Sequence, residues 1–233
     1  MSKLPERASS SVKPGPVVAG QPGSCPLCRH QAAQPYHRDQ FREYHQCTRC
    51  ALVFVPSEFH LSAQAEKAYY ELHENHLEDA GYRRFLQRCA TPLLSRLAPG
   101  ARGLDFGCGP APLLARMLEE HGHPMAIYDL FFQPDTSVLD DRFDFVVSTE
   151  VVEHLADPMA TLEMLWCRIN AGGVLAIMTK LVASQERFAS WHYIRDPTHV
   201  IFFSRETFRW LAGHWSAKLE FSGNDVIFLS RPA

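Results

Sequence analysis

The sequence predicts an α/β fold with a mostly parallel sheet, preceded by a small cysteine-rich module. Three observations carry this prediction. Short apolar runs of strand type alternate with segments of helical spacing through the second half of the chain. One such run, ending at Phe106, is followed by a glycine turn and a helix start. Near the N-terminus, two C-x-x-C pairs stand at a spacing typical of a metal-binding module.

Composition supports one α/β domain with a small accessory unit, because 46% of the 233 residues are hydrophobic and can bury a sizeable core. The formal net charge of −3 lacks the positive surplus that drives non-specific nucleic-acid binding. No apolar run reaches the roughly 18 residues of a membrane helix, and the first residues lack the apolar stretch of a secretory signal. Seven cysteines, an odd number, do not suit an extracellular disulfide framework. We therefore expect a cytoplasmic protein that does not enter a membrane.

Four segments are expected along the chain. The start of the chain is rich in Ser, Pro and Gly, which predicts disorder. The paired cysteines define the module. Helical spacing of apolar residues after the module indicates a connector or lid. The segments are a disordered tail at 1–22, a cysteine module at 23–60, a helical connector at 61–98 and the main domain at 99–233.

The module and the connector show local start and stop signals. The module ends in the strand-like run 52–55, which Pro56 closes. In the connector, Ser62 can cap a first helix, and a second is expected over 81–97. Pro92 either kinks that second helix or begins a new one as a first-turn residue.

Strands and helices alternate in the main domain, which implies a mostly parallel sheet with helices on both faces. Gly172-Gly173 is expected to end the helix before it, and the last two strands form a hairpin at Gly223-Asn224. The expected strands are 103–106, 124–128, 143–148, 174–179, 217–222 and 225–230, and the helices are 112–121, 158–169 and 204–212.

The glycine turn follows the first of these strands. Gly107 and Gly109 let the backbone approach a ligand without an intervening Cβ, and a following helix N-terminus attracts polar groups. Asp129 ends the next strand, at an offset that suits hydrogen bonds to both ribose hydroxyls of a nucleoside. Each feature also has an alternative that involves no ligand. The glycines would then form a plain turn between strand and helix, and Asp129 would be a turn residue.

These motifs resemble those of class I S-adenosylmethionine-dependent methyltransferases. LDFGCGP at 104–110 is similar to their first motif, FDFVVSTEVVEHL at 143–155 to the segment of the fourth strand, and NAGGVL at 170–175 to the turn before the fifth. The resemblance covers about residues 80–230. It implies methyl transfer from S-adenosylmethionine on a Rossmann-like fold, with a mostly parallel seven-stranded sheet and a reversed last strand.

Residue roles follow from the resemblance. The glycine turn with Asp105 would surround the methionine part of the cofactor, and Tyr128 and Leu130 would flank the adenosine. Two departures stand out: Ala111 replaces a frequent third glycine, and the short stretch after Asp129 leaves little room for a third strand. The predicted cofactor-binding residues are Asp105, Phe106, Gly107, Cys108, Gly109, Tyr128, Asp129, Leu130, Glu150 and Val151.

The paired cysteines predict a structural zinc site, because four thiolates at this spacing close a tetrahedral shell. Reduced or disulfide-bonded cysteines are the alternative. Arg29 and Ala51 stand where zinc ribbons often carry glycine. Similar ribbons precede some ribosomal-RNA methylases and some sugar C-methyltransferases, so the module does not identify an acceptor. The predicted ligands are Cys25, Cys28, Cys47 and Cys50.

Polar and aromatic residues at 191–204 predict one wall of an acceptor pocket. Methyl transfer needs alignment and, for a weak nucleophile, a base, and His192 and His199 are rival candidates, with Glu150 as a further catalytic candidate. Bracing of a loop is the alternative role. Residues that either close over the cofactor or lie on the surface are Tyr69, Tyr70, His73, Asn75 and His76.

Several functions stay open on sequence alone. The favoured one is methyl transfer to a small or carrier-linked metabolite. The alternatives are an RNA or protein methyltransferase guided by the ribbon, and a non-catalytic binding protein with the same fold. A nicotinamide dehydrogenase is disfavoured, because Pro112 stands where the dinucleotide pattern G-x-G-x-x-G requires glycine.

Overall fold

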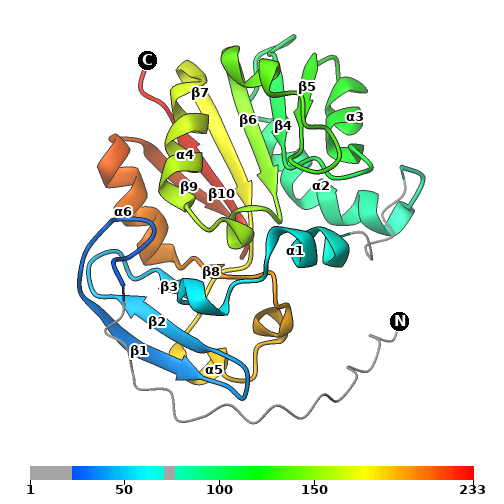
Figure 1. Ribbon diagram of the computed structural model, residues 1–233. Coiled ribbons are helices and arrows are strands. Elements are labelled where there is room, and N and C mark those ends of the chain that lie inside the picture. The colour runs from blue at the N-terminus through cyan, green and yellow to red at the C-terminus, as the bar shows by residue number, and fades with distance from the viewer. Residues whose placement is uncertain (1–22, 71–76) are drawn as a thin grey trace.

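The computed structural model describes residues 23–70 and 77–233. The expected tail at 1–22 and the candidate lid residues His73, Asn75 and His76 lie outside the described residues. A cysteine-rich unit packs below a three-layered α/β domain (Figure 1). In the part of the chain that is described, no helix combines the length and the apolar character needed to cross a membrane.

The main sheet has six strands in the order β5-β4-β6-β7-β10-β9. β4 pairs in parallel with β5 and β6, and β6 pairs in parallel with β7, whereas β10 runs antiparallel to both of its neighbours. The mostly parallel sheet with a reversed last strand is thereby confirmed. The strands are β4 Gly103–Phe106, β5 Met125–Tyr128, β6 Phe143–Thr149, β7 Ile169–Met178, β9 Lys218–Ser222 and β10 Val226–Ser230.

The expected count of seven strands is wrong for the described residues. Between β5 and β6 the chain makes an isolated bridge from Asp129 to Gln133 and a 3-10 turn, η2, over Thr136–Asp140. This connection is too short for a further strand with its crossover, which needs a dozen or more residues. β5 therefore forms the edge of the sheet.

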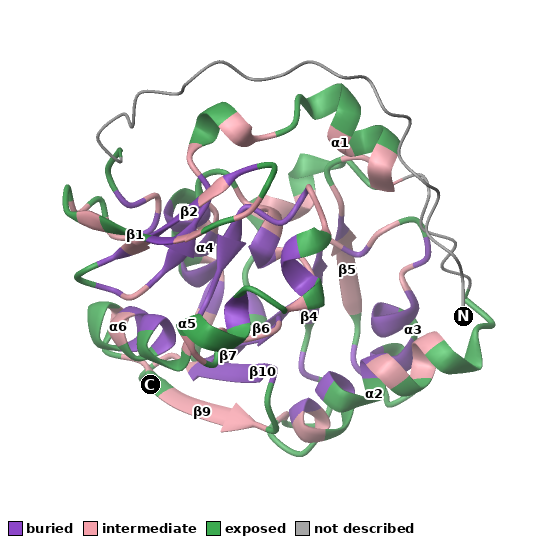
Figure 2. Cartoon of the chain, turned by 90° about the horizontal axis from the view of Figure 1, so that it is seen from below, coloured by how far each residue is buried: buried purple, intermediate pink, exposed green. Residues whose placement is uncertain are grey.

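Helices cover both faces of the sheet because successive strand residues point to opposite sides. On β6, Phe145 and Val147 pack with α2 and α3, whereas Val146 packs into the cluster on the face of α4 and α6. Figure 2 shows the inner strands buried and the edge strand β9 only partly so. The helices are α1 Ala63–Tyr70, α2 Ala80–Leu94, α3 Leu113–Glu119, α4 Pro158–Cys167, α5 Gln185–Phe188 and α6 Arg205–Trp215.

Helix boundaries follow local capping chemistry. The Asp79 side chain accepts from the backbone nitrogens of Gly81 and Tyr82 at 2.6 and 3.1 Å, which starts α2. Pro92 lies inside α2, which continues as one helix to Leu94.

The expected helix end at Gly172-Gly173 is wrong. α4 ends at Cys167, and both glycines lie within β7. A Cβ at Gly173 would stand 2.5 Å from the carbonyl oxygen of Asp144, so glycine is needed there for close approach of the strands rather than for a helix end.

The module forms an antiparallel sheet in the order β1-β2-β3-β8, and β8 comes from the main domain. Val53 pairs with Phe202 and Phe54 with Ile201, and the Val55 nitrogen donates to the Val200 carbonyl at 2.8 Å. The sheet therefore extends beyond the expected segment 23–60. Its strands are β1 Ala33–Arg38, β2 Glu43–Cys47, β3 Val53–Phe54 and β8 Ile201–Phe202.

Candidate active site

A cavity of about 830 Å³ opens where β4, β5 and β6 end. The sheet order reverses here, with β5 on one side of β4 and β6 on the other, and such switch points are the usual ligand sites of open α/β sheets. Tyr70 of α1 and Tyr82 of α2 contribute to the lining. The cavity walls thus combine the strand ends with the connector helices.

The glycine turn after β4 forms one side of the cavity. Gly107 and Gly109 both adopt positive φ angles, +79° and +65°. A Cβ at Gly107 would lie 2.3 Å from Val151 Cγ2, so a side chain cannot fit there, whereas Gly109 has nothing within 4 Å of its Cβ position. Gly107 permits the tight turn, and Gly109 keeps the backbone open to a ligand.

Asp129 lines the cavity and also braces the turn. Its Oδ2 accepts from the Gly109 nitrogen at 2.9 Å, and its Oδ1 accepts from the nitrogens of Phe131 and Phe132 at 2.9 and 3.0 Å. A carboxylate offers about four acceptor positions, so it keeps capacity for a ligand hydroxyl. The two interpretations made from sequence, ligand contact and turn residue, are therefore compatible.

Glu150 is a strained, poorly satisfied acid in the cavity wall. Its φ is +54°, its nitrogen donates to the Met178 carbonyl at 2.8 Å, and its Oε1 is buried without a hydrogen-bond partner among the described residues. Burial, followed by the charge of Glu153, raises the pKa of Glu150 to about 8. A donor or cationic group of a ligand would satisfy this acid.

Asp105 lies behind the glycine turn rather than in the cavity lining and is 2% exposed. Burial raises the pKa of Asp105 to about 7, opposed by a hydrogen bond from the Ala115 backbone and supported by the charge of Asp129. The structure brings together the remaining predicted cofactor residues around the cavity, namely Phe106, Gly107, Cys108, Gly109, Tyr128, Asp129, Leu130, Glu150 and Val151.

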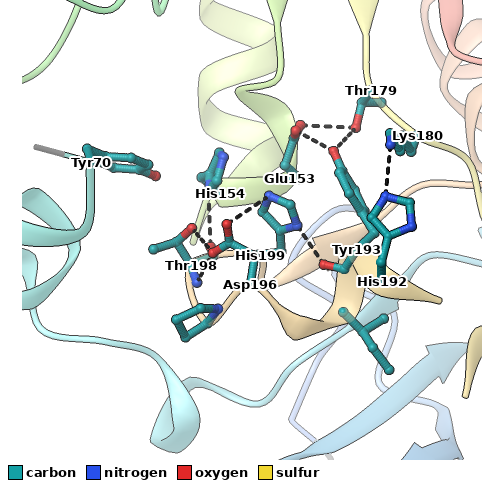
Figure 3. Close-up of polar contacts among 12 residues, drawn as sticks. Tyr70, Glu153, His154, Thr179, Lys180, His192, Tyr193, Asp196, Thr198 and His199 are labelled. Carbon is teal, nitrogen blue, oxygen red and sulfur yellow. Dashed lines mark hydrogen bonds and ion pairs between the residues drawn. The ribbon is translucent and has the colours of Figure 1, made fainter. Parts of the chain in front are cut away.

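His154, Asp196 and His199 also line the cavity, and Figure 3 shows these three side chains close together. The His199 Nδ1 lies 2.8 Å from the Tyr193 carbonyl oxygen, and the ring centroids of the two histidines are 4.7 Å apart. Burial, and then the charge of His154, lowers the pKa of His199 to about 4. The His199 ring is therefore neutral near pH 7.

Glu153 lies next to the two histidines. It is fully buried, its Oε2 accepts from the Thr179 hydroxyl at 3.0 Å, and its Oε1 accepts a short hydrogen bond from the Tyr193 hydroxyl. Glu153 and His154 belong to the segment 143–155 that resembles the fourth strand of the family, yet their roles were not predicted. The adjacency of an acid and a histidine after a buried strand is the signal that could have identified them.

His192 does not line this cavity. Its Nε2 lies 3.0 Å from Lys180 Nζ, at the edge of a separate hollow formed by the segment after β7. Burial, then the charges of Lys180 and Arg195, lower the pKa of His192. The structure therefore separates the two histidines that the sequence offered as rival bases.

Arg42 connects the module to the predicted acceptor wall. The side chain is buried, and its guanidinium donates to the backbone carbonyls of Ile194, Asp196, Pro197 and His199 at 2.8 to 3.2 Å. This one side chain thus holds the backbone of the loop that carries His199. Nothing in the sequence pattern distinguished Arg42 from other arginines.

The four paired cysteines converge in the module. The Sγ atoms of Cys25 and Cys50 are 3.6 Å apart, those of Cys28 and Cys47 are 3.4 Å apart, and all four sulfurs lie within 4.8 Å of one another. None forms a disulfide.

Each C-x-x-C pair forms a tight turn, here called a knuckle, and the two knuckles have matching backbones. Arg29 and Ala51 take left-handed φ angles of +57° and +58°, and their nitrogens donate to the carbonyls of Cys25 and Cys47 at 2.9 and 3.0 Å. The knuckle turn thus forms despite the absence of glycine at these two positions.

Comparison with known proteins gives a family match. The family described as "Methyltransferase domain" matches residues 74–215. No curated protein matches the chain.

Solved structures resemble the chain at low identity. The Burkholderia thailandensis 1,6-didemethyltoxoflavin-N1-methyltransferase is 16% identical over 86% of this chain and 100% of its own, with a TM-score of 0.48. A TehB-like methyltransferase from Corynebacterium glutamicum is 18% identical over 72% and 100%, with a TM-score of 0.45. The Synechocystis magnesium protoporphyrin IX methyltransferase is 12% identical over 72% and 95%, with a TM-score of 0.47.

Proposed function

The chain belongs to the methyltransferase-domain family that matches residues 74–215, and we propose that it methylates a small or carrier-linked metabolite with S-adenosylmethionine as donor. The observation that carries this proposal is the convergence of the glycine turn, Asp129 and Glu150 on one cavity. The enzyme class follows from the family. We propose the class of acceptor and the roles of the cavity residues from the geometry of the cavity.

The cavity chemistry fits the donor. The open backbone at Gly109 gives room for a close approach, and Asp129 offers a carboxylate for ribose hydroxyls beside Tyr128. The unpartnered Oε1 of Glu150 suits a cationic or hydrogen-bond-donating part of the ligand. S-adenosylmethionine, when bound, supplies a methyl group on a positively charged sulfonium.

We infer that the acceptor lies between the glycine turn and the wall formed by Tyr70, His154 and His199. Aromatic and apolar side chains exclude water there, and the polar groups orient the acceptor for in-line displacement. The methyl group moves from sulfur to the acceptor atom, which gives up its proton. Of the two predicted histidine bases, His199 is the one placed to receive that proton, because His192 lines a separate hollow and not this cavity.

A cavity of about 830 Å³ suits a small acceptor, and the net charge of −3 disfavours a large nucleic acid. An RNA or protein acceptor guided by the cysteine module stays the alternative, as does a non-catalytic binding protein.

We propose that the four cysteines hold one structural zinc ion. In a tetrahedron with Zn–S bonds of about 2.3 Å, the sulfurs stand about 3.8 Å apart, close to the separations of 3.6 and 3.4 Å in the two pairs. The ion would stabilise the knuckles, and through them the β3–β8 pairing that holds the acceptor wall.

The direct experiment uses purified protein, methyl-labelled S-adenosylmethionine and fractionated extracts or a defined metabolite panel. Label in a small product supports the proposal, whereas label only in RNA or protein favours the alternative. Cofactor binding without transfer to any fraction would support the binding-protein alternative. Gly107→Val is the matched inactive control, because its side chain would clash with Val151.

A further inference from the structure

Three potential metal ligands meet at the acceptor end of the cavity. Glu153 and His154 lie on η3, Val152–His154, directly after β6, and His199 precedes β8. Their ligand atoms all lie within 4.8 Å of one another, and Figure 3 shows the three side chains grouped together. A carboxylate and two imidazoles form a common ligand set for catalytic metal sites.

The hydrogen bonds of both imidazoles leave the same nitrogen available. The His154 Nδ1 lies 3.2 Å from the Thr198 carbonyl oxygen, and the His199 Nδ1 lies 2.8 Å from the Tyr193 carbonyl oxygen. A carbonyl only accepts, so each Nδ1 carries the proton and each Nε2 carries a lone pair. Such bonds to backbone carbonyls are the usual support of metal-ligating histidines.

Glu153 is fixed in the same manner. The hydroxyls of Thr179 and Tyr193 donate to its two oxygens, which orients the carboxylate and leaves further lone pairs on each oxygen. Its complete burial would hold that orientation against solvent.

We propose that Glu153, His154 and His199 bind one first-row divalent cation, with a coordination position open to the cavity. Both histidines line that cavity, so a ligand seated there can reach the ion. The protein set has three ligands, which is the number that leaves a catalytic zinc-type site open, in contrast to the closed four-thiolate site in the module.

The role of this cation rests on the proposed methyl transfer. A hydroxyl-bearing acceptor would place its oxygen in the open position, where the ion weakens the O–H bond. The proton leaves to solvent, an O–C bond to the methyl group forms, and the C–S bond breaks, so that the products are a methyl ether and S-adenosylhomocysteine. This assignment replaces the base role of His199, because the ion occupies the Nε2 lone pair that a base requires.

The test adds Co²⁺ to protein whose cysteine site is already loaded with zinc. Zn²⁺ binds protein sites more tightly than Co²⁺, so the thiolate site keeps its zinc and cobalt reports a second site. We expect one added Co²⁺ per chain, with visible d–d absorption and no thiolate charge-transfer absorption. The measurement needs neither donor nor acceptor, so its failure is distinct from failure of methyl transfer.

Two variants and a control decide the assignment. His154→Phe and His199→Asn should each weaken Co²⁺ binding by about 10-fold or more, while zinc content stays unchanged and so reports folding. His121→Asn is the control, because the His121 Nδ1 also lies 2.8 Å from a backbone carbonyl, that of Met117, but outside this cluster. The proposal would be overturned if the unchanged protein bound no added Co²⁺. It would also be overturned if both variants bound Co²⁺ as tightly as the unchanged protein does.

Discussion

The guanidinium of Arg42 donates a hydrogen bond to the backbone carbonyl of His199 at 2.9 Å. Arg42 lies in the cysteine module and His199 in the cavity wall of the main domain. With three further carbonyls of the same loop bound by the same side chain, the module supports the cavity wall rather than forming an independent appendage.

Replacement of Arg42 tests that support. Arg42→Met should lower methyl transfer by about 10-fold or more, because misplacement of the loop disturbs acceptor alignment, and should reduce the free energy of unfolding by on the order of 3 kcal/mol. S-adenosylmethionine affinity, measured by calorimetry, should change little. Arg38→Met is the control, since Arg38 is exposed and its side chain pairs with Glu43 rather than with the loop. Unchanged turnover in Arg42→Met would refute a positioning role.

Zinc at the four cysteines should be measurable by elemental analysis as about one ion per chain. Cys50→Ser should lose the ion and destabilise the module, because a structural zinc site contributes directly to folding. Cys167→Ser should keep it, since Cys167 is exposed and outside the cluster. A metal-free protein with full stability would exclude the site.

The glycine turn makes a steric prediction. Gly107→Val should abolish S-adenosylmethionine binding, because the new side chain must adopt a φ of +79° and would overlap Val151. Circular dichroism should still show a folded α/β protein. Gly213→Ala on α6 is the matched control, as its Cβ position is open. Binding by Gly107→Val at ordinary affinity would remove the turn from the site.

Asp105 makes the stability of the cofactor-free protein depend on pH. Its pKa is raised in the folded protein from an ordinary value of 3.8 to about 7, so the folded state binds more protons between these values. Stability should therefore fall as pH rises from about 4 to 7, with a contribution approaching 1.4 kcal/mol per pH unit. Asp105→Asn should flatten that dependence in thermal unfolding series. Identical pH slopes for the two proteins would show that the carboxyl titrates normally.

Local signals predicted most of the main domain. β4 was expected at its observed bounds, because an apolar strand followed by a glycine turn is a pattern within one short segment. The end of α4 was misjudged, because pairing of β7 with its neighbours determines the backbone at Gly172-Gly173. The left-handed backbone of Arg29 likewise depends on the knuckle hydrogen bond to Cys25.

Long-range contacts account for what the sequence did not indicate. Pairing of Val53 with Phe202 joins segments that have no shared local pattern. Arg42 binds main-chain carbonyls, which every residue type possesses, so its partners leave no sequence signal. His199 was singled out by its surroundings in the chain, but its approach to His154 required the folded loop.

The cavity is the proposed S-adenosylmethionine site, and calorimetry on Asp129→Ala tests this assignment most directly. Loss of a charge-assisted hydrogen bond to the ribose, worth roughly 1.5–3 kcal/mol, should weaken binding about tenfold or more. Asp135→Ala is the control, because Asp135 accepts from the Ser137 nitrogen in the same connection but does not line the cavity. Binding by the unchanged protein, with the predicted loss in Asp129→Ala alone, supports the site. Equal affinity of Asp129→Ala and the unchanged protein would contradict it.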